Sequence, residues 1–118
     1  MKEYMLIYKG GDPAWMKNTS QEDMAASLER WGEWMGGLAQ KDQLVTGGSP
    51  LQYAGKTVTK AGIITDIAAS ELKELVSGYS IIKAENIDEA SEIAKHCPIF
   101  NTPVSAVEVR EIVQLPND

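Results

Sequence analysis

The chain begins with a segment that is apolar on both of its sides. Along residues 3–9, Tyr4, Leu6 and Tyr8 alternate with Met5 and Ile7. Successive side chains of a strand point to opposite faces, so this pattern predicts a strand that is covered on both sides. Gly10-Gly11-Asp12-Pro13 follows and predicts a turn.

A helical pattern begins near Ser20, whose hydroxyl is suited to cap a helix with Asp23 three residues on. Its apolar positions then recur at intervals of four and three residues: Met24, Leu28, Trp31, Met35 and Leu38. At about 100° per residue they share one helix face, with Trp34 at its edge. Gly36-Gly37 indicates either a fraying end or a close approach to a sheet. The helix is expected to end by about Asp42.

The remainder of the chain alternates between β-rich and helical segments. A turn is predicted at Gly47-Gly48-Ser49-Pro50, and a second helix runs from Asn86 or Asp88 to about His96, where Pro98 stops it. Residues 67–77 fit either a helical turn or a long loop. The predicted strands are residues 43–46, 56–59, 61–65, 79–85 and 104–113.

The resulting order, β-α-β-β-β-α-β, predicts an α+β fold. Its simplest assembly is a ferredoxin-like antiparallel sheet with both helices on one face, because right-handed crossovers place them on the same side. The other face is then bare, and either Met5 and Ile7 or Leu6 and Tyr8 lie on it. Soluble monomers rarely leave so apolar a face in water. We therefore expect a homodimer whose two sheets enclose a barrel-like core, with Glu108 and Arg110 paired with each other or across the two-fold axis.

Composition limits the chain to one globular domain spanning residues 1–118. Its 11 Lys and Arg against 17 Asp and Glu give a net charge of −6, which disfavours nucleic-acid binding and binding to an anionic membrane. One Cys and one His cannot form a disulfide or a Cys/His zinc site within a subunit. No metal site is expected, and no cofactor is expected either. The first residues carry no signal-peptide pattern, and a cytoplasmic location is the expectation.

Few short motifs carry chemistry. Gly55-Lys56-Thr57 lacks the first glycine of a phosphate-binding loop, where Pro50 stands, and Ser70-Glu71-Leu72-Lys73 lacks the partner motifs of a serine nucleophile. Cys97 is expected to pack near the end of the second helix. His96, next to it, either caps that helix or serves a functional site.

Two further kinds of side chain are candidates for a site. Asp66 ends a predicted strand, where a carboxylate either starts a turn or lines a pocket. Trp31 and Trp34 fit packing between helix and sheet, and the alternative for both is stacking on a ligand.

Taken together, these segments resemble the YCII-related family, and its DGPF branch in particular. The resemblance covers nearly the whole chain and implies a dimeric α+β barrel of ferredoxin-like subunits. It rests on Tyr4-Met5-Leu6-Ile7-Tyr8, Gly47-Gly48-Ser49-Pro50-Leu51, Thr65-Asp66, Lys73-Glu74, Gly78-Tyr79-Ser80-Ile81-Ile82, Ile87-Asp88-Glu89-Ala90, Cys97-Pro98 and Ala106-Val107-Glu108-Val109-Arg110.

Two departures from the family pattern bear on activity. The name-giving Asp-Gly-Pro-Phe reads Asp66-Ile67-Ala68-Ala69. Family members proposed to be enzymes carry a His early in the first helix and an Asp before the Pro that ends the second. Here the first helix has no His and the second motif reads Cys97-Pro98, so that pair cannot be assembled.

The leading hypothesis is a small-molecule-binding homodimer with a pocket between the first helix, the sheet and residues 67–77. Any catalysis would be cofactor-free proton transfer or elimination on a small organic substrate. His96 and Asp66 are the candidate acid/base groups, and Lys73 is the candidate electrophile or anion anchor. Trp31 and Tyr79 are candidate ligand contacts. The alternative is a non-enzymatic accessory dimer that binds a metabolite or a protein partner, since DGPF-type proteins are often linked with sigma factors. A haem-degrading or quinol monooxygenase on the same barrel is a third possibility, with His96 as the haem ligand.

Overall fold

The structure, a computed structural model, describes residues 1–11, 14–66 and 74–116. Its elements follow one another as β1 (Lys2–Gly10), α1 (Trp15–Asn18), α2 (Gln21–Gln40), β2 (Leu44–Thr46), β3 (Lys56–Val58), β4 (Ile64–Asp66), β5 (Val76–Ala84), α3 (Ile87–Lys95), the 3₁₀ helix η2 (Pro98–Asn101) and β6 (Ser105–Glu111). The short helix α1 is not predicted by the sequence pattern, and most of the segment for which a turn or a loop was expected, residues 67–73, lies outside the described residues.

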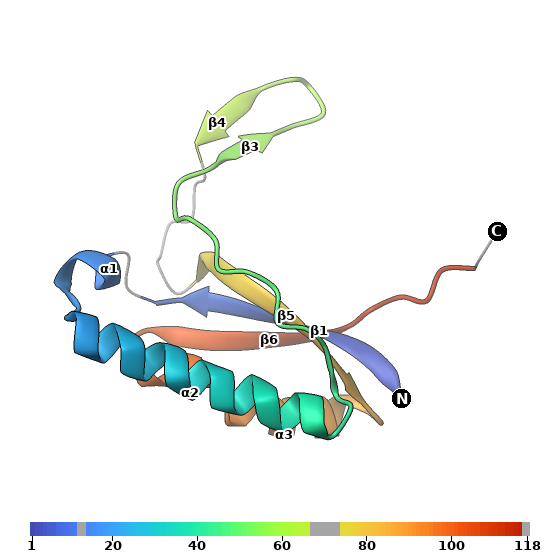
Figure 1. Ribbon diagram of the computed structural model, residues 1–118. Coiled ribbons are helices and arrows are strands. Elements are labelled where there is room, and N and C mark those ends of the chain that lie inside the picture. The colour runs from blue at the N-terminus through green and yellow to red at the C-terminus, as the bar shows by residue number, and fades with distance from the viewer. Residues whose placement is uncertain (12–13, 67–73, 117–118) are drawn as a thin grey trace.

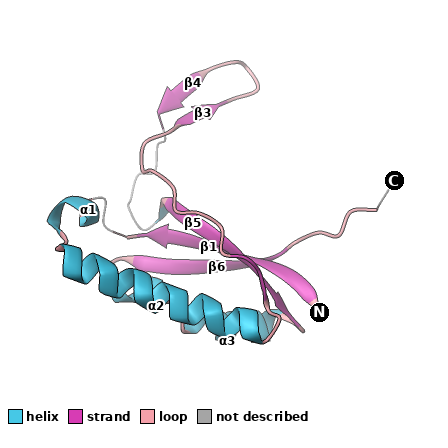
Figure 2. Cartoon of the chain, in the orientation of Figure 1, coloured by secondary structure: helices cyan, strands magenta, loops and turns pink. Residues whose placement is uncertain are grey.

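Four strands form one antiparallel sheet in the order β2-β5-β1-β6. Helices α2 and α3 lie on the same face of this sheet (Figures 1 and 2). The ferredoxin-like α+β architecture predicted from the order of elements is therefore confirmed. Strand β5 begins at Val76, three residues before the predicted start, and β6 ends at Glu111, two residues before the predicted end.

The side chains of the central strand β1 alternate between the two faces of the sheet, as the sequence pattern predicts. Tyr4, Leu6 and Tyr8 are buried under the helices, and Met5 and Ile7 lie on the opposite, open face of the sheet. The core is completed by inward residues of β5 and the helices: Leu38, Ile82, Ala84, Ala90, Ala94, Cys97 and Ile99.

Helix α2 begins as expected, because the Ser20 hydroxyl accepts a hydrogen bond from the Asp23 amide at 3.1 Å. The face that it buries differs from the predicted stripe. Leu28 is 67% exposed, whereas Trp34, expected at the edge, packs with Trp31 against the core. The helix is thus rotated toward the Trp34 side. The expectation for Gly36-Gly37 was also wrong on both counts, since the helix continues to Gln40 and nothing lies within 4 Å of a side chain added at either glycine.

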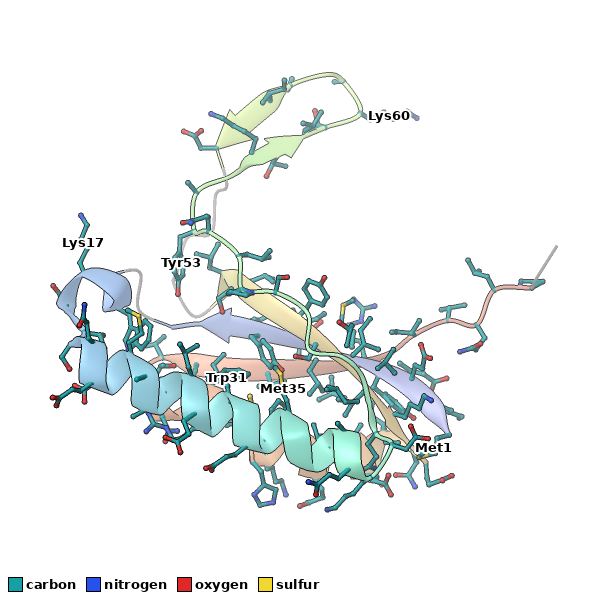
Figure 3. All side chains as sticks on the ribbon, in the orientation of Figure 1. Met1, Lys17, Trp31, Met35, Tyr53 and Lys60 are labelled. Carbon is teal, nitrogen blue, oxygen red and sulfur yellow. The ribbon has the colours of Figure 1, made fainter. Side chains whose placement is uncertain are left out.

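The predicted strands at residues 56–59 and 61–65 do form, but not in the main sheet. Within residues 1–11, 14–66 and 74–116, strands β3 and β4 pair only with each other, as a separate two-stranded hairpin. Figure 1 shows this hairpin standing away from the body, on the side of the sheet opposite α2 and α3. The expectation of a single antiparallel sheet is corrected accordingly. At the hairpin's base the Tyr53 hydroxyl donates a hydrogen bond to the Gly10 carbonyl at 3.2 Å, and the tip, with Lys60, projects outward (Figure 3).

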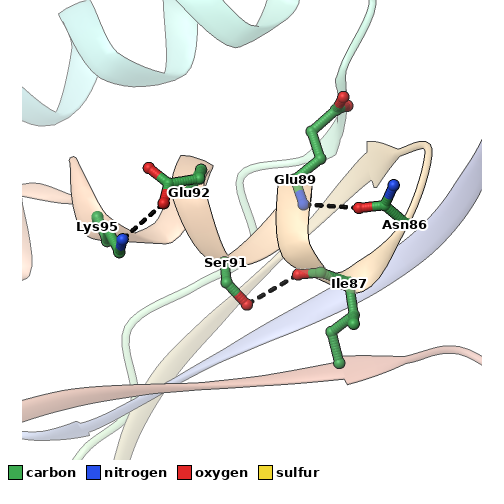
Figure 4. Close-up of polar contacts among 6 residues, drawn as sticks. All are labelled: Asn86, Ile87, Glu89, Ser91, Glu92 and Lys95. Carbon is green, nitrogen blue, oxygen red and sulfur yellow. Dashed lines mark hydrogen bonds and ion pairs between the residues drawn. The ribbon is translucent and has the colours of Figure 1, made fainter.

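Helix α3 is fixed by local hydrogen bonds at its start. The Asn86 side chain caps it by accepting from the Glu89 amide at 2.9 Å, and the Ser91 hydroxyl donates to the Ile87 carbonyl at 2.8 Å (Figure 4). Near its end Lys95 pairs with Glu92 at 2.6 Å. The helix ends at Lys95 with His96 as its C-terminal capping residue, close to the predicted end. Pro98 opens a 3₁₀ helix that the sequence pattern does not predict.

Candidate functional site

A buried hydrogen-bonded cluster lies between α2 and the sheet. The Tyr8 hydroxyl donates to the Ser80 hydroxyl oxygen at 2.7 Å, and the Ser80 hydroxyl donates to the Gly47 carbonyl at 2.8 Å. Cys97 is buried beside them, and its thiol and the Tyr8 hydroxyl affect each other's pKa. We call these three side chains the Tyr8–Ser80–Cys97 cluster. It joins β1, β5 and the segment after α3.

The turn at Gly48 holds the acceptor of this cluster in place. Gly48 has φ +68°, and a Cβ on it would lie 1.9 Å from the Tyr79 carbonyl oxygen. Only glycine allows this left-handed turn to approach β5 so closely. The turn consequently presents the Gly47 carbonyl to Ser80.

Aromatic rings close the cluster from the helix side. The ring of Trp31 meets that of Tyr8 edge-on, with centroids 5.3 Å apart, and Trp34 meets Trp31 in the same manner at 5.9 Å. Figure 3 shows Trp31 and Met35 between α2 and the sheet. Trp31 is thus placed in the packed layer that covers Tyr8.

Burial sets the protonation of the cluster. Removal from water raises the pKa of the Cys97 thiol to about 11 and raises that of the Tyr8 hydroxyl well above its usual range. Both groups are therefore neutral at pH 7. The cluster can donate and accept hydrogen bonds, but it has no group that exchanges a proton readily near neutrality.

An open cleft of about 540 Å³ adjoins the cluster through Cys97. Arg30 and Trp34 enter it from α2, His96 from the end of α3, and Phe100 from η2. The remaining lining residues are Glu33, Lys95, Cys97, Pro98 and Asn101. A cleft of this size accommodates a small organic molecule, with cationic side chains beside aromatic ones.

The candidate acid/base residues lie in different places within the chain. His96 is exposed and lines the cleft just described. Asp66 is exposed in β4, where it pairs with Lys56 at 2.5 Å, and it lines a second, smaller hollow of about 260 Å³ with Tyr53, Ala54 and Gly55. The structure does not bring the two residues into one site of a single chain.

The candidate ligand contacts are also separated. Trp31 belongs to the layer over Tyr8, and Tyr79, one residue before Ser80, points to the open face of the sheet. Lys73 lies outside the described residues.

Sequence reasoning missed the roles of Tyr8 and Ser80. The sequence did contain a signal for them: Ser80 stands at an inward position of a buried strand. A buried hydroxyl requires a hydrogen-bond partner, so this serine predicts a polar contact in the core.

The open face of the sheet carries an apolar centre and a charged flank. Its centre is made by two cross-strand pairs, Ile7 with Tyr79 and Met5 with Ile81. The flank on β6 carries Glu108, which accepts from Lys9 at 2.8 Å and lies 3.9 Å from Arg110. These cations lower the pKa of the Glu108 carboxyl, Lys9 most strongly. The pairing of Glu108 with Arg110 agrees with the sequence expectation.

The fold and this arrangement define a ferredoxin-like α+β protein with a buried polar cluster beneath its first long helix. The chain belongs to the YCII-related domain family, whose pattern matches residues 3–116. No individual curated protein matches the chain. The residue before the proline that follows α3 is Cys97, not an acidic residue. Its thiol belongs to the neutral cluster beneath α2.

Two further observations apply to the described part of the chain. No helix within it is both long enough and apolar enough to span a membrane. Nor do three or more His, Cys, Asp or Glu side chains gather there in a way that could hold a metal ion.

Proposed function

We propose that the protein is a homodimeric small-molecule-binding protein of the YCII-related type, in which two copies meet through the open faces of their sheets. The apolar centre formed by Ile7, Tyr79, Met5 and Ile81 supports this assembly, because water would otherwise contact it along the middle of the sheet. In the Lys9–Glu108–Arg110 flank one carboxylate lies between two cations, so each copy would bring only a small net positive charge to the border of such an interface.

The ligand site that we propose is the cleft between α2 and the end of α3. The observation that carries this proposal is the meeting of Arg30 and His96 with the rings of Trp34 and Phe100 in one cleft. A guanidinium group recognises a carboxylate through paired hydrogen bonds, and aromatic walls favour a flat apolar body. The site suits a small planar organic acid.

Benzoate is a suitable probe of this site, and its binding can be followed by ligand-observed NMR titration. Wild-type protein is expected to bind it saturably. Arg30→Gln should weaken the Kd at least about tenfold through loss of a charge-assisted hydrogen bond. The control is Lys60→Gln at the hairpin tip, which removes the same charge far from the cleft and should leave the Kd unchanged. Absence of saturable binding, or equal Kd values for wild type and Arg30→Gln, would contradict the proposed site.

If this site performs chemistry, the proton-transfer role falls to His96. A bound acid would lie beside its imidazole, whereas Asp66 could contribute only from a different part of the assembly. His96→Gln should then abolish turnover of the ligand while leaving its binding largely intact.

A non-enzymatic accessory dimer is the second candidate function. The neutrality of the Tyr8–Ser80–Cys97 cluster favours this function. Burial keeps the Tyr8 hydroxyl and the Cys97 thiol protonated at pH 7, so these groups do not transfer protons. The two candidates differ in the fate of a bound ligand. An NMR time course in which a tight-binding acid stays unchanged supports the accessory function, and its conversion supports the enzyme.

Within the family, we propose that the chain belongs to the DGPF branch. The glycine-rich turn at 47–51, which presents the Gly47 carbonyl to Ser80, and Asp66 at the end of β4 support this placement.

A further inference from the structure

The β3–β4 hairpin presents an apolar pair to solvent. Val58 pairs with Ile64 across the two strands, and these side chains are 67% and 62% exposed. The ion pair between Lys56 and Asp66 lies on the same hairpin face, two residues along each strand. Thr57 points to the opposite face. One side of the hairpin is therefore an apolar patch bordered by a neutralised charge pair.

Among the described residues the hairpin has little support. Its strands contain three residues each and, within that part of the chain, pair only with each other, and an isolated two-stranded hairpin is marginally stable in water. Ile63, at the turn side of β4, is also 58% exposed. Covering Val58 and Ile64 with another surface would remove their apolar side chains from water and so stabilise the hairpin.

The position of the hairpin indicates which surface could cover Val58 and Ile64. It stands on the side of the sheet away from α2 and α3, which is the side of the open face (Figure 1). The Tyr53–Gly10 hydrogen bond fixes its base at the end of β1, the strand that supplies Met5 and Ile7 to that face. A body docked on the open face would consequently lie beside the hairpin.

We propose that the β3–β4 hairpin is a dimerisation arm whose Val58–Ile64 face packs on the second copy of this chain. The inference rests on the homodimer of the proposed function and adds a second, separate contact to it. By two-fold symmetry each copy gives one arm and receives one. The internal Lys56–Asp66 pair leaves the contacting face without net charge, so two acidic chains can approach there.

The arm can be tested by measuring the dimer Kd with sedimentation velocity. The variant Val58→Thr with Ile64→Thr keeps β-branched residues, which suit strands, while it removes apolar surface from both arms. Its dimer Kd should rise at least about thirtyfold. The matched control, Thr57→Ser, trims a methyl group from the opposite hairpin face and should change the Kd less than about threefold.

Hydrogen exchange of residues 56–66 supplies a second measurement on the unmodified chain. Protection of these amides should rise as the protein concentration is raised through the dimer Kd. If the wild type is monomeric, the homodimer and the arm both fail. If the wild type is dimeric but the double variant keeps its Kd and the hairpin amides show no concentration dependence, the arm alone is wrong and the open-face dimer stands.

Discussion

At the scale of single residues, Ser80 connects three parts of the fold that are far apart in sequence. It is fully buried, accepts a hydrogen bond from Tyr8 and donates one to Gly47. No buried side-chain nitrogen or oxygen in the described part of the chain lacks a hydrogen-bond partner. Removing the hydroxyl would leave the buried Tyr8 hydroxyl and the partly buried Gly47 carbonyl without that partner, which costs more than the lost bond itself.

Ser80→Ala is therefore expected to lower the free energy of unfolding by about 1–3 kcal/mol. Urea denaturation followed by Trp fluorescence measures this change. The control is Ser91→Ala on α3, whose hydroxyl bonds to the Ile87 carbonyl on a partly exposed helix surface and whose loss should change stability by less than about 0.5 kcal/mol. Equal effects of the two substitutions would show that the cluster adds no stability.

At the scale of elements, α2 shows how tertiary packing chooses among the faces of a helix. The 4-3-4-3 spacing of apolar residues placed Leu28 and Met35 in the buried stripe, and Trp31 and Leu38 with them. In the structure Trp31 packs edge-on against Tyr8 and Trp34 packs edge-on against Trp31, and this orientation of the helix leaves Leu28 outside. Larger rings bury more apolar area than leucine, so their packing decides the orientation.

This rotation gives a paired prediction. Leu38→Ala should lower the free energy of unfolding by about 2–4 kcal/mol, because Leu38 is only 7% exposed and its removal leaves a cavity. Leu28→Ala should change it by no more than about 0.5 kcal/mol. Chemical denaturation of both variants at the same protein concentration tests the pair. A larger loss for Leu28→Ala than for Leu38→Ala would contradict the orientation of α2.

At the scale of the whole molecule, two features of one side of the sheet remain without cover in a single chain. The open face has an apolar centre, and the hairpin beside it has an apolar patch. Both are accounted for if the functional unit is a pair of chains. The cleft at the end of α3 lies on the helix layer, so dimerisation leaves it accessible to a ligand.

Light scattering of the wild type should accordingly give a mass of twice 12.9 kDa at micromolar concentration. Ile7→Lys should shift the protein to the monomer, since it introduces a charge at the centre of the proposed interface. Leu28→Lys, an equal charge on the exposed side of α2, should remain dimeric. Retention of the dimer by Ile7→Lys would exclude the open face as the interface.

The candidate site could be predicted only in part. Helical spacing predicts that Trp31 faces the sheet, and the proline after Cys97 predicts that this residue packs near the end of α3. Both signals lie within a few residues of the position that they predict. The hydrogen bonds of Tyr8 with Ser80 and of Ser80 with Gly47 join residues 72 and 33 positions apart. No local pattern reports which side chains meet over such separations.

The sequence alone determined the alternation of β1, the capped start of α2, the end of α3 shortly before Pro98 and the ferredoxin-like order of strands. Each of these depends on residues within a few positions of one another, where side-chain periodicity and capping chemistry act directly. Only the tertiary structure decided the rotation of α2, the neutral cluster beneath it and the departure of residues 56–66 from the sheet. These depend on the competition among distant segments for the same buried surface, which the spacing of residues along one segment does not record.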